Sequence, residues 1–153
     1  MSENFKGKLD FDGVKKHILA GNSILTFRNS KTGKHLTYKV KKHKEENLWF
    51  VFYLSGPDND NNYSYLGVIS KNFHTKKFEF RLTKKSRASK DSVVFKGFNF
   101  IFQKLRNDIS FPNELEVWHE GVCGRCGRKL THPESIDTGF GPHCVKIANN
   151  IRR

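Results

Sequence analysis

The stretch Leu48-Trp-Phe-Val-Phe-Tyr-Leu54 is the longest apolar run in the sequence. Its seven residues are mostly aromatic or β-branched, which favours a buried strand over a helix. The run is far shorter than the roughly 18 apolar residues that a membrane-spanning helix requires, so nothing in the sequence indicates a membrane protein. We therefore expect residues 48–54 to form a central strand of a sheet.

Four neighbouring segments have strand patterns of their own. Residues 36–41 alternate between apolar and polar side chains, which is typical of a half-buried strand. Residues 22–28 precede them, and the turn-forming residues 29–33 join the two segments as a hairpin. Residues 63–69 and 78–82 add two more strands. The sequence thus predicts about five antiparallel strands.

Two segments have helical patterns. Residues 11–20 predict a short helix that Asp12 can cap and Gly21 can end. Apolar residues between Asp91 and Asn107 recur on one helical face. The start of this second helix can be capped by Ser89, Asp91 or Ser92. A helix with one apolar face packs on a sheet, so the predicted fold class is α+β.

The charge is distributed unevenly along the 153 residues. Lys and Arg number 28 against 15 Asp and Glu, a net charge of +13. Residues 1–110 carry a net charge of +12, whereas residues 111–153 carry only +1. We therefore expect a basic α+β domain over 1–110 and a second, nearly neutral module over 111–153. This charge excludes an acidic mimic of nucleic acid and favours a polyanion, an acidic protein or an anionic membrane surface as the partner.

All three cysteines lie in the last fifth of the chain. An odd number of cysteines in so short a segment does not fit a disulfide framework, and it favours a metal site in a reducing compartment. Cys123 and Cys126 form a C-x2-C pair, and Gly127 permits the turn of a zinc knuckle. Cys144 supplies a third thiolate, so we expect the C-terminal module over 111–153 to be a zinc-knuckle module that binds zinc. A structural zinc site takes four ligands, so one more is needed.

Histidines near the cysteines are the candidates for the fourth zinc ligand. His119 lies four residues before Cys123 and is favoured. His132 precedes Pro133, where a capping box from Thr131 to Glu134 predicts a short helix that Gly139 ends. His143 adjoins Cys144, and adjacent residues seldom reach the same ion. Glu120 is a weaker candidate. The predicted ligand set is His119, Cys123, Cys126 and Cys144, with His132 and His143 as alternatives.

The expected zinc site is structural. A catalytic zinc keeps an open position for water, whereas four protein ligands close the site. The N-terminal part of the sequence also has no recognisable nucleophile, paired-carboxylate or phosphate-loop motif. We therefore expect a protein that is not an enzyme.

The stretch from His119 to Cys144, with the pattern HEGxCxxCGRKLTxPESIxxGxGPxC, resembles a small zinc-finger-like family of unknown function. That family is widespread in bacteriophage and plasmid-encoded proteins. Residues 56–59, 65–67 and 85–87 resemble the body of its longer phage members, so the resemblance extends from about residue 20 to 146. It implies that the three cysteines are ligands and that the protein is of phage or mobile-element origin and acts in a bacterial cytoplasm. It implies no activity.

Basic residues cluster at several places in the sequence. Residues 84–90 form a basic loop that leads into the second predicted helix, where phosphate binding is physically natural. Exposed aromatic side chains can stack on bases, and Tyr53, Tyr63, Tyr65 and Phe73 are candidates. The predicted nucleic-acid-binding residues are Lys39, Lys41, Lys42, Lys84, Lys85, Arg87, Lys90, Arg125 and Arg128.

The sequence as a whole indicates a non-enzymatic, zinc-containing nucleic-acid-binding protein. DNA and RNA, and single and double strands, all remain open as ligands, and so does the oligomeric state. The alternative is a phage effector that binds and modulates a host protein in replication or defence, with the positive charge matching an acidic host surface.

Overall fold

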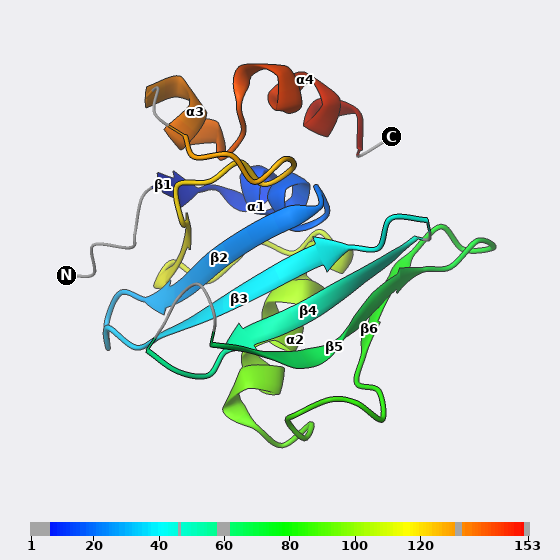
Figure 1. The fold of residues 1–153 in the computed structure, drawn as a ribbon. Coiled ribbons are helices and arrows are strands. Elements are labelled where there is room, and N and C mark those ends of the chain that lie inside the picture. Colours follow the sequence, from blue (N-terminus) through cyan, green and yellow to red (C-terminus); the bar gives the residue numbers. More distant parts are fainter. Residues whose placement is uncertain (1–6, 46, 58–61, 131–132, 152–153) are drawn as a thin grey trace.

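One antiparallel sheet organises the chain (Figure 1). The structure is a computed structural model that describes residues 7–45, 47–57, 62–130 and 133–151. The strands are β1 (Gly7–Leu9), β2 (Asn22–Asn29), β3 (His35–Lys42), β4 (Leu48–Leu54), β5 (Tyr63–Lys71), β6 (Phe78–Arg81) and β7 (Leu115–His119). They lie in the order β1-β7-β2-β3-β4-β5-β6. The helices are α1 (Phe11–Ile18), α2 (Val93–Arg106), α3 (Pro133–Thr138) and α4 (Pro142–Ile151).

The predicted α+β class is confirmed, and β4 lies inside the sheet between β3 and β5 as expected. The strand count was too low, because the sheet has seven strands rather than about five. The two missed strands are β1, which has only three residues, and β7.

Strand β7 lies beyond the expected domain boundary at residue 110. It inserts between β1 and β2, where His119 pairs in register with Gly7 on one side and with Leu25 on the other. The segment after residue 110 therefore contributes a strand to the same sheet that the first 110 residues build. A cut at residue 110 would remove β7 from its place between β1 and β2, and the division into two domains stays a prediction.

Helices α1 and α2 pack against one face of the sheet. The apolar stripe of α2 is buried there as the sequence predicted: Phe98, Ile101, Phe102 and Leu105. The Phe98 ring lies 4.8 Å from the ring of Phe80 and 5.2 Å from the ring of Tyr38, measured between ring centroids. The Tyr38 hydroxyl donates a hydrogen bond of 2.6 Å to the Val94 carbonyl in α2. This face forms the main core.

The helix caps differ partly from expectation. Ser92 caps α2, and its hydroxyl accepts a hydrogen bond from the backbone N–H of Phe95. Helix α1 is capped by Asp10, whose carboxylate accepts a 2.7 Å hydrogen bond from the backbone N–H of Gly13. Asp12, the predicted cap, lies in the first turn, where it forms an ion pair with Lys16. An N-cap carboxylate reaches the N–H groups two or three residues ahead, which Asp10 does here.

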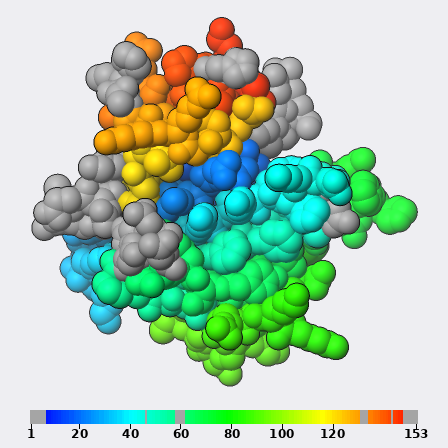
Figure 2. All heavy atoms as spheres, viewed as in Figure 1, coloured from blue at the N-terminus to red at the C-terminus, as the bar shows by residue number. Residues whose placement is uncertain are grey.

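The opposite face of the sheet is open toward the viewer in Figures 1 and 2, and α2 lies behind the strands. Helices α3 and α4 lie beyond the β1–β7 end of the sheet, above α1 in Figure 1. A second, smaller core forms beneath them from Ala20, Cys123, Leu130, Phe140 and Cys144. In the described residues, no helix has the length and apolar character needed to cross a membrane.

Candidate functional site

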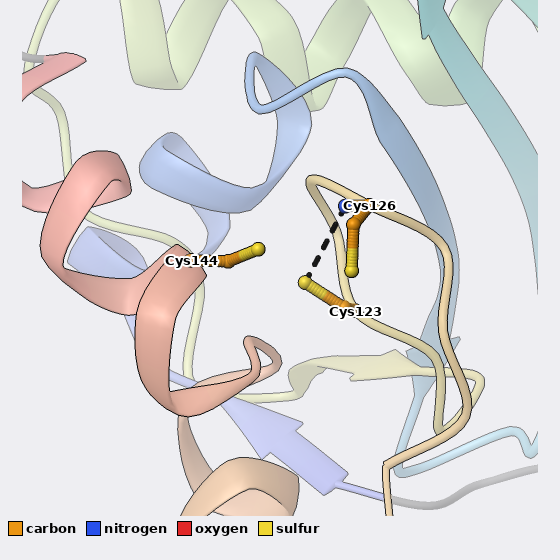
Figure 3. Close-up of side chains that lie close together, drawn as sticks. All are labelled: Cys123, Cys126 and Cys144. Carbon is orange, nitrogen blue, oxygen red and sulfur yellow. Dashed lines mark hydrogen bonds between the residues drawn. The ribbon is translucent and has the colours of Figure 1, made fainter.

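The three cysteines come together between the knuckle and helix α4 (Figure 3). Their sulfur atoms lie within 4.8 Å of one another. Cys123 and Cys126 flank the knuckle turn, and Cys144 lies in the first turn of α4. Cys123 and Cys144 are buried, whereas Cys126 is exposed. Helix α4 thus brings a residue that is distant in sequence to the C-x2-C pair.

The knuckle itself is a tight turn held by backbone hydrogen bonds. The Cys123 N–H donates to the Arg128 carbonyl at 2.7 Å, and the Gly127 N–H donates to the Cys123 carbonyl at 2.9 Å. Gly127 has a φ of 79°, in the left-handed region where a residue without a Cβ is favoured. The Cys126 N–H points at the Cys123 sulfur at 3.5 Å, drawn as the dashed line in Figure 3. The turn therefore aims backbone dipoles at a sulfur atom.

The surroundings of the sulfur atoms favour the thiolate form at Cys123 and the neutral thiol at Cys144. Burial by itself raises the pKa of the Cys123 thiol, but backbone hydrogen bonds from Cys126 and Gly141 outweigh it and lower this pKa to about 7. Burial, together with the neighbouring thiols, raises the pKa of Cys144. The guanidinium of Arg125 lies 3.5 Å from the Cys144 sulfur. A cation bound among the three sulfur atoms would stabilise all of them as thiolates.

The cluster fits a metal ion that prefers sulfur ligands. Zinc–sulfur bonds of about 2.3 Å in tetrahedral geometry place thiolates roughly 3.8 Å apart. Three sulfur atoms within 4.8 Å of one another are close to that arrangement. The three cysteines can therefore hold a metal ion, and they are the one group of possible ligands that the structure brings together in the described residues.

The structure does not place His119 with the cysteines. Its side chain is fully buried on β7, and both ring nitrogens have backbone partners. Nδ1 accepts a 2.9 Å hydrogen bond from the Gly121 N–H, so Nε2 carries the proton and donates to the Ile136 carbonyl. The alternative ligands His132 and the side chain of His143 lie outside the described residues.

A second buried histidine, His17 of α1, fixes the C-terminal segment to the rest of the protein. Its ring stacks on that of His119, with centroids 5.8 Å apart, and its Nδ1 lies 2.6 Å from the Ser23 hydroxyl. A Cβ added at Gly139 would come within 2.6 Å of the His17 ring. No local pattern in the sequence points to the contact between His17 and Gly139, because these two residues are more than a hundred positions apart.

The sheet brings several predicted nucleic-acid-binding residues together on its open face. The register pairs Lys39 with Phe52 and Lys41 with Phe50, so these side chains share a face. Phe52 in turn pairs with Tyr65 of β5. Next to them lies a surface hollow lined by Phe50, Phe52, Tyr65 and the loop residues 84–87. We call the residues Lys39, Lys41, Phe50, Phe52, Tyr65 and 84–87 the aromatic–basic face.

Other predicted nucleic-acid-binding residues lie elsewhere. Lys42 faces the helix side of the sheet, where its Nζ lies 5.5 Å from the centre of the Trp49 ring. Lys90 is exposed but does not line the hollow. Arg125 directs its guanidinium at Cys144, and Arg128 is exposed on the knuckle. These four residues do not join the aromatic–basic face.

The aromatic candidates divide in the same way. Tyr65 lies on the aromatic–basic face, and Tyr63 lies on the same side of β5, with the Lys39 Nζ 5.6 Å from the centre of its ring. Tyr53 pairs with Tyr38 on the helix side. Phe73 is 75% exposed in the turn between β5 and β6, away from the hollow. Phe50 and Phe52 were not predicted as binding residues, although alternation along β4 would have placed them on the face opposite Trp49 and Val51.

Comparison with known proteins gives one match, in the cysteine segment. The search of curated proteins and the search of solved structures found no match. The matched segment begins at the first residue of β7, contains all three cysteines and ends within α4. Residues 115–148 match a family of unknown function (DUF6011).

Proposed function

We propose that this protein binds nucleic acid through the aromatic–basic face, and that a structural Zn2+ held by Cys123, Cys126 and Cys144 stabilises its C-terminal segment. The proposed activity is binding without catalysis. Phosphate groups need only positive charge at a suitable spacing, which a row of lysines supplies.

The observation that carries the proposal is a set of cations with no acidic partner. In the part of the chain that the structure describes, ion pairs involve six basic residues, and none of them belongs to the aromatic–basic face. Five cations of this face have no ion pair with a described residue: Lys39, Lys41, Lys84, Lys85 and Arg87. Gathering so many like charges without a counterion raises the energy of the free protein, and a polyanion would relieve that repulsion.

The zinc supports this activity indirectly. The knuckle is fixed to the start of β2, since the Asn22 N–H donates to the Gly124 carbonyl and the Asn22 side-chain amide donates to the Arg125 carbonyl, both at 2.6 Å. Strand β2 in turn pairs with β3, which carries Lys39 and Lys41. A bound ion would therefore help to hold the start of β2 in place without itself contacting the nucleic acid.

A salt series tests the proposal. The affinity of zinc-loaded protein for labelled single-stranded and duplex oligonucleotides is measured by fluorescence anisotropy. The logarithm of the affinity is expected to fall with the logarithm of salt concentration, by about 0.7 per phosphate contact on single strands and about 0.9 on duplex. Replacing Lys84, Lys85 and Arg87 together by Gln is expected to reduce the single-strand slope by about 2.

The matched control replaces Lys34, Lys76 and Lys96 by Gln, which removes the same charge from exposed positions outside the aromatic–basic face. An equal loss of slope in both triple variants would contradict the assignment of this face. Absence of binding at low salt would contradict nucleic-acid binding altogether, and an acidic host protein would then be the partner to seek.

A further inference from the structure

The open face of the sheet carries aromatic side chains where polar ones are usual. An antiparallel sheet with helices on one side commonly has polar residues on the other. Here the register places Phe52 and Tyr65 next to Lys39 in one row across the strands, and Phe50 next to Lys41 in the adjacent row. The three rings are only half-buried. In the described part of the chain, no helix lies over this face of β3, β4 and β5 (Figure 1).

The three rings form one continuous surface. The Tyr65 ring lies 5.8 Å from that of Phe52 and 6.3 Å from that of Phe50, measured between centroids. The Phe52 and Tyr65 rings meet edge to face, at 68°. Each of the three rings is only half-buried, so part of its surface stays available to a flat ligand.

The basic loop is fixed at the rim of this surface. The Arg87 N–H donates to the Tyr65 carbonyl at 2.9 Å, beside the half of β5 that β6 does not reach. The Thr83 hydroxyl lies 3.2 Å from the Tyr65 hydroxyl, and the Ser86 hydroxyl accepts a 2.8 Å hydrogen bond from the Thr83 N–H. Among described residues, the lining of the hollow includes Lys84, Lys85 and Arg87 and no acidic side chain. Cations are therefore held within a side-chain length of the rings.

We propose that the aromatic–basic face binds single-stranded nucleic acid, with bases stacked on Phe50, Phe52 and Tyr65 and phosphates held by the surrounding lysines and Arg87. This inference rests on the proposed function and specifies its ligand. A duplex hides the faces of its bases and offers only phosphates to a sheet, so it would gain nothing from these rings. A single strand exposes both base faces and phosphates, which matches the two kinds of side chain that gather here.

The charge argues against an apolar peptide as the occupant. Five cations that form no ion pair within the described part of the chain border a surface of three rings. Base stacking is tolerant of sequence because every base has a π-face, so we expect weak sequence preference.

The test compares single-stranded and duplex DNA of one sequence with the full, zinc-loaded chain. Phe50→Leu and Phe52→Leu keep the apolar bulk of these positions but remove the ring. Each is expected to weaken single-strand binding by roughly 5- to 150-fold, and to leave duplex binding nearly unchanged. The slope with salt should stay at the wild-type value in both variants, because stacking releases no counterions.

Two further variants control this experiment. Phe52→Trp restores a stacking surface and is expected to keep single-strand binding. Phe100→Leu removes a ring that is 47% exposed on α2, on the other side of the sheet, and is expected to change nothing. Circular dichroism and urea unfolding confirm that each variant is folded.

The outcomes separate this inference from the proposed function. Equal affinity for single strands and duplex, with Phe52→Leu behaving as Phe100→Leu, would overturn the stacking inference and leave phosphate binding in place. A loss of slope in Phe52→Leu would also overturn it. No binding to either nucleic acid would overturn both.

Discussion

Replacing Gly139 by Ala probes how the C-terminal segment is attached to the sheet. Gly139 has a φ of 79°, where a Cβ costs about 1–2 kcal/mol. The new methyl group would also lie 2.6 Å from Cδ2 and 3.0 Å from Nε2 of His17, a ring that is fully buried and stacked on His119. Overpacking of this kind typically adds about 1–3 kcal/mol. We therefore expect a total loss of about 2–5 kcal/mol in the free energy of unfolding.

A matched variant separates the two contributions. Gly33 has a similar φ of 76°, but an added Cβ there meets no atom within 4 Å. Gly33→Ala should therefore show the backbone cost alone, and the two variants should differ by about 1–3 kcal/mol. Urea unfolding of zinc-saturated protein measures both. In a His17→Ser background, Gly139→Ala should lose most of its excess cost, since the ring is gone. If Gly139→Ala costs no more than Gly33→Ala, the proposed contact between α1 and the C-terminal segment does not exist.

Three further predictions concern the zinc site, the packing of α2 and the buried His17. Cys126→Ser is expected to lower the zinc content, measured by elemental analysis, and to abolish the rise of Tm with added zinc. His119→Gln should keep the metal. If Cys126→Ser retained a full equivalent of zinc, the proposed zinc site would be wrong. Phe98→Ala should reduce the free energy of unfolding by about 3–5 kcal/mol in urea, and a loss below 1 kcal/mol would mean that α2 does not pack as described. Burial lowers the pKa of His17 from 6.5 to about 3, so the folded state binds fewer protons than the unfolded state at acidic pH. The free energy of unfolding should therefore fall as pH drops below 6.5, by up to about 1.4 kcal/mol per pH unit. In His17→Gln this part of the acid sensitivity should disappear, and identical pH profiles of the variant and the wild type would refute the pKa shift.

Local patterns predicted the elements that local patterns can determine. The alternation over residues 36–41 and the apolar run at β4 each depend on neighbours in sequence, and both strands form as expected. The α2 stripe was also correct, because one helix presents one face to one sheet. Strand β1 has three residues, too few to display a period. Strand β7 has five residues, of which Val117 and His119 are buried, and the tryptophan between them breaks the apolar–polar alternation in the sequence.

The candidate site divides along the same line. The C-x2-C spacing and Cys144 correctly predicted which sulfur atoms gather, because short spacing and a helix start constrain them directly. His119 was favoured on spacing alone. His119 lies on strand β7 and its ring is buried there. Its two ring nitrogens form hydrogen bonds with the Ile136 carbonyl and the Gly121 N–H. Whether His119 belongs to β7 or to the loop that follows decides whether its ring can reach the cysteines. The spacing between His119 and Cys123 in the sequence does not determine this.

The aromatic–basic face depends on strand pairing. Lys39, Phe52 and Tyr65 lie on three different strands, and they meet only because β3, β4 and β5 are adjacent in this register. A shift of one residue would turn Phe52 into the core and break the row. Lys39 and Tyr65 were each predicted from the sequence as binding candidates. That they lie next to Phe52 follows only from the pairing of β3, β4 and β5.

The most direct test of nucleic-acid binding at this face is a nuclear magnetic resonance titration of the isotopically labelled, zinc-loaded chain with an unlabelled single-stranded oligonucleotide. Amide signals of β3, β4, β5 and the loop 83–87 are expected to shift on binding. Ring protons of Phe50, Phe52 and Tyr65 should move upfield as bases stack on them. Shifts confined to the knuckle around Arg125 and Arg128, or to the exposed surface of α2, would contradict the account.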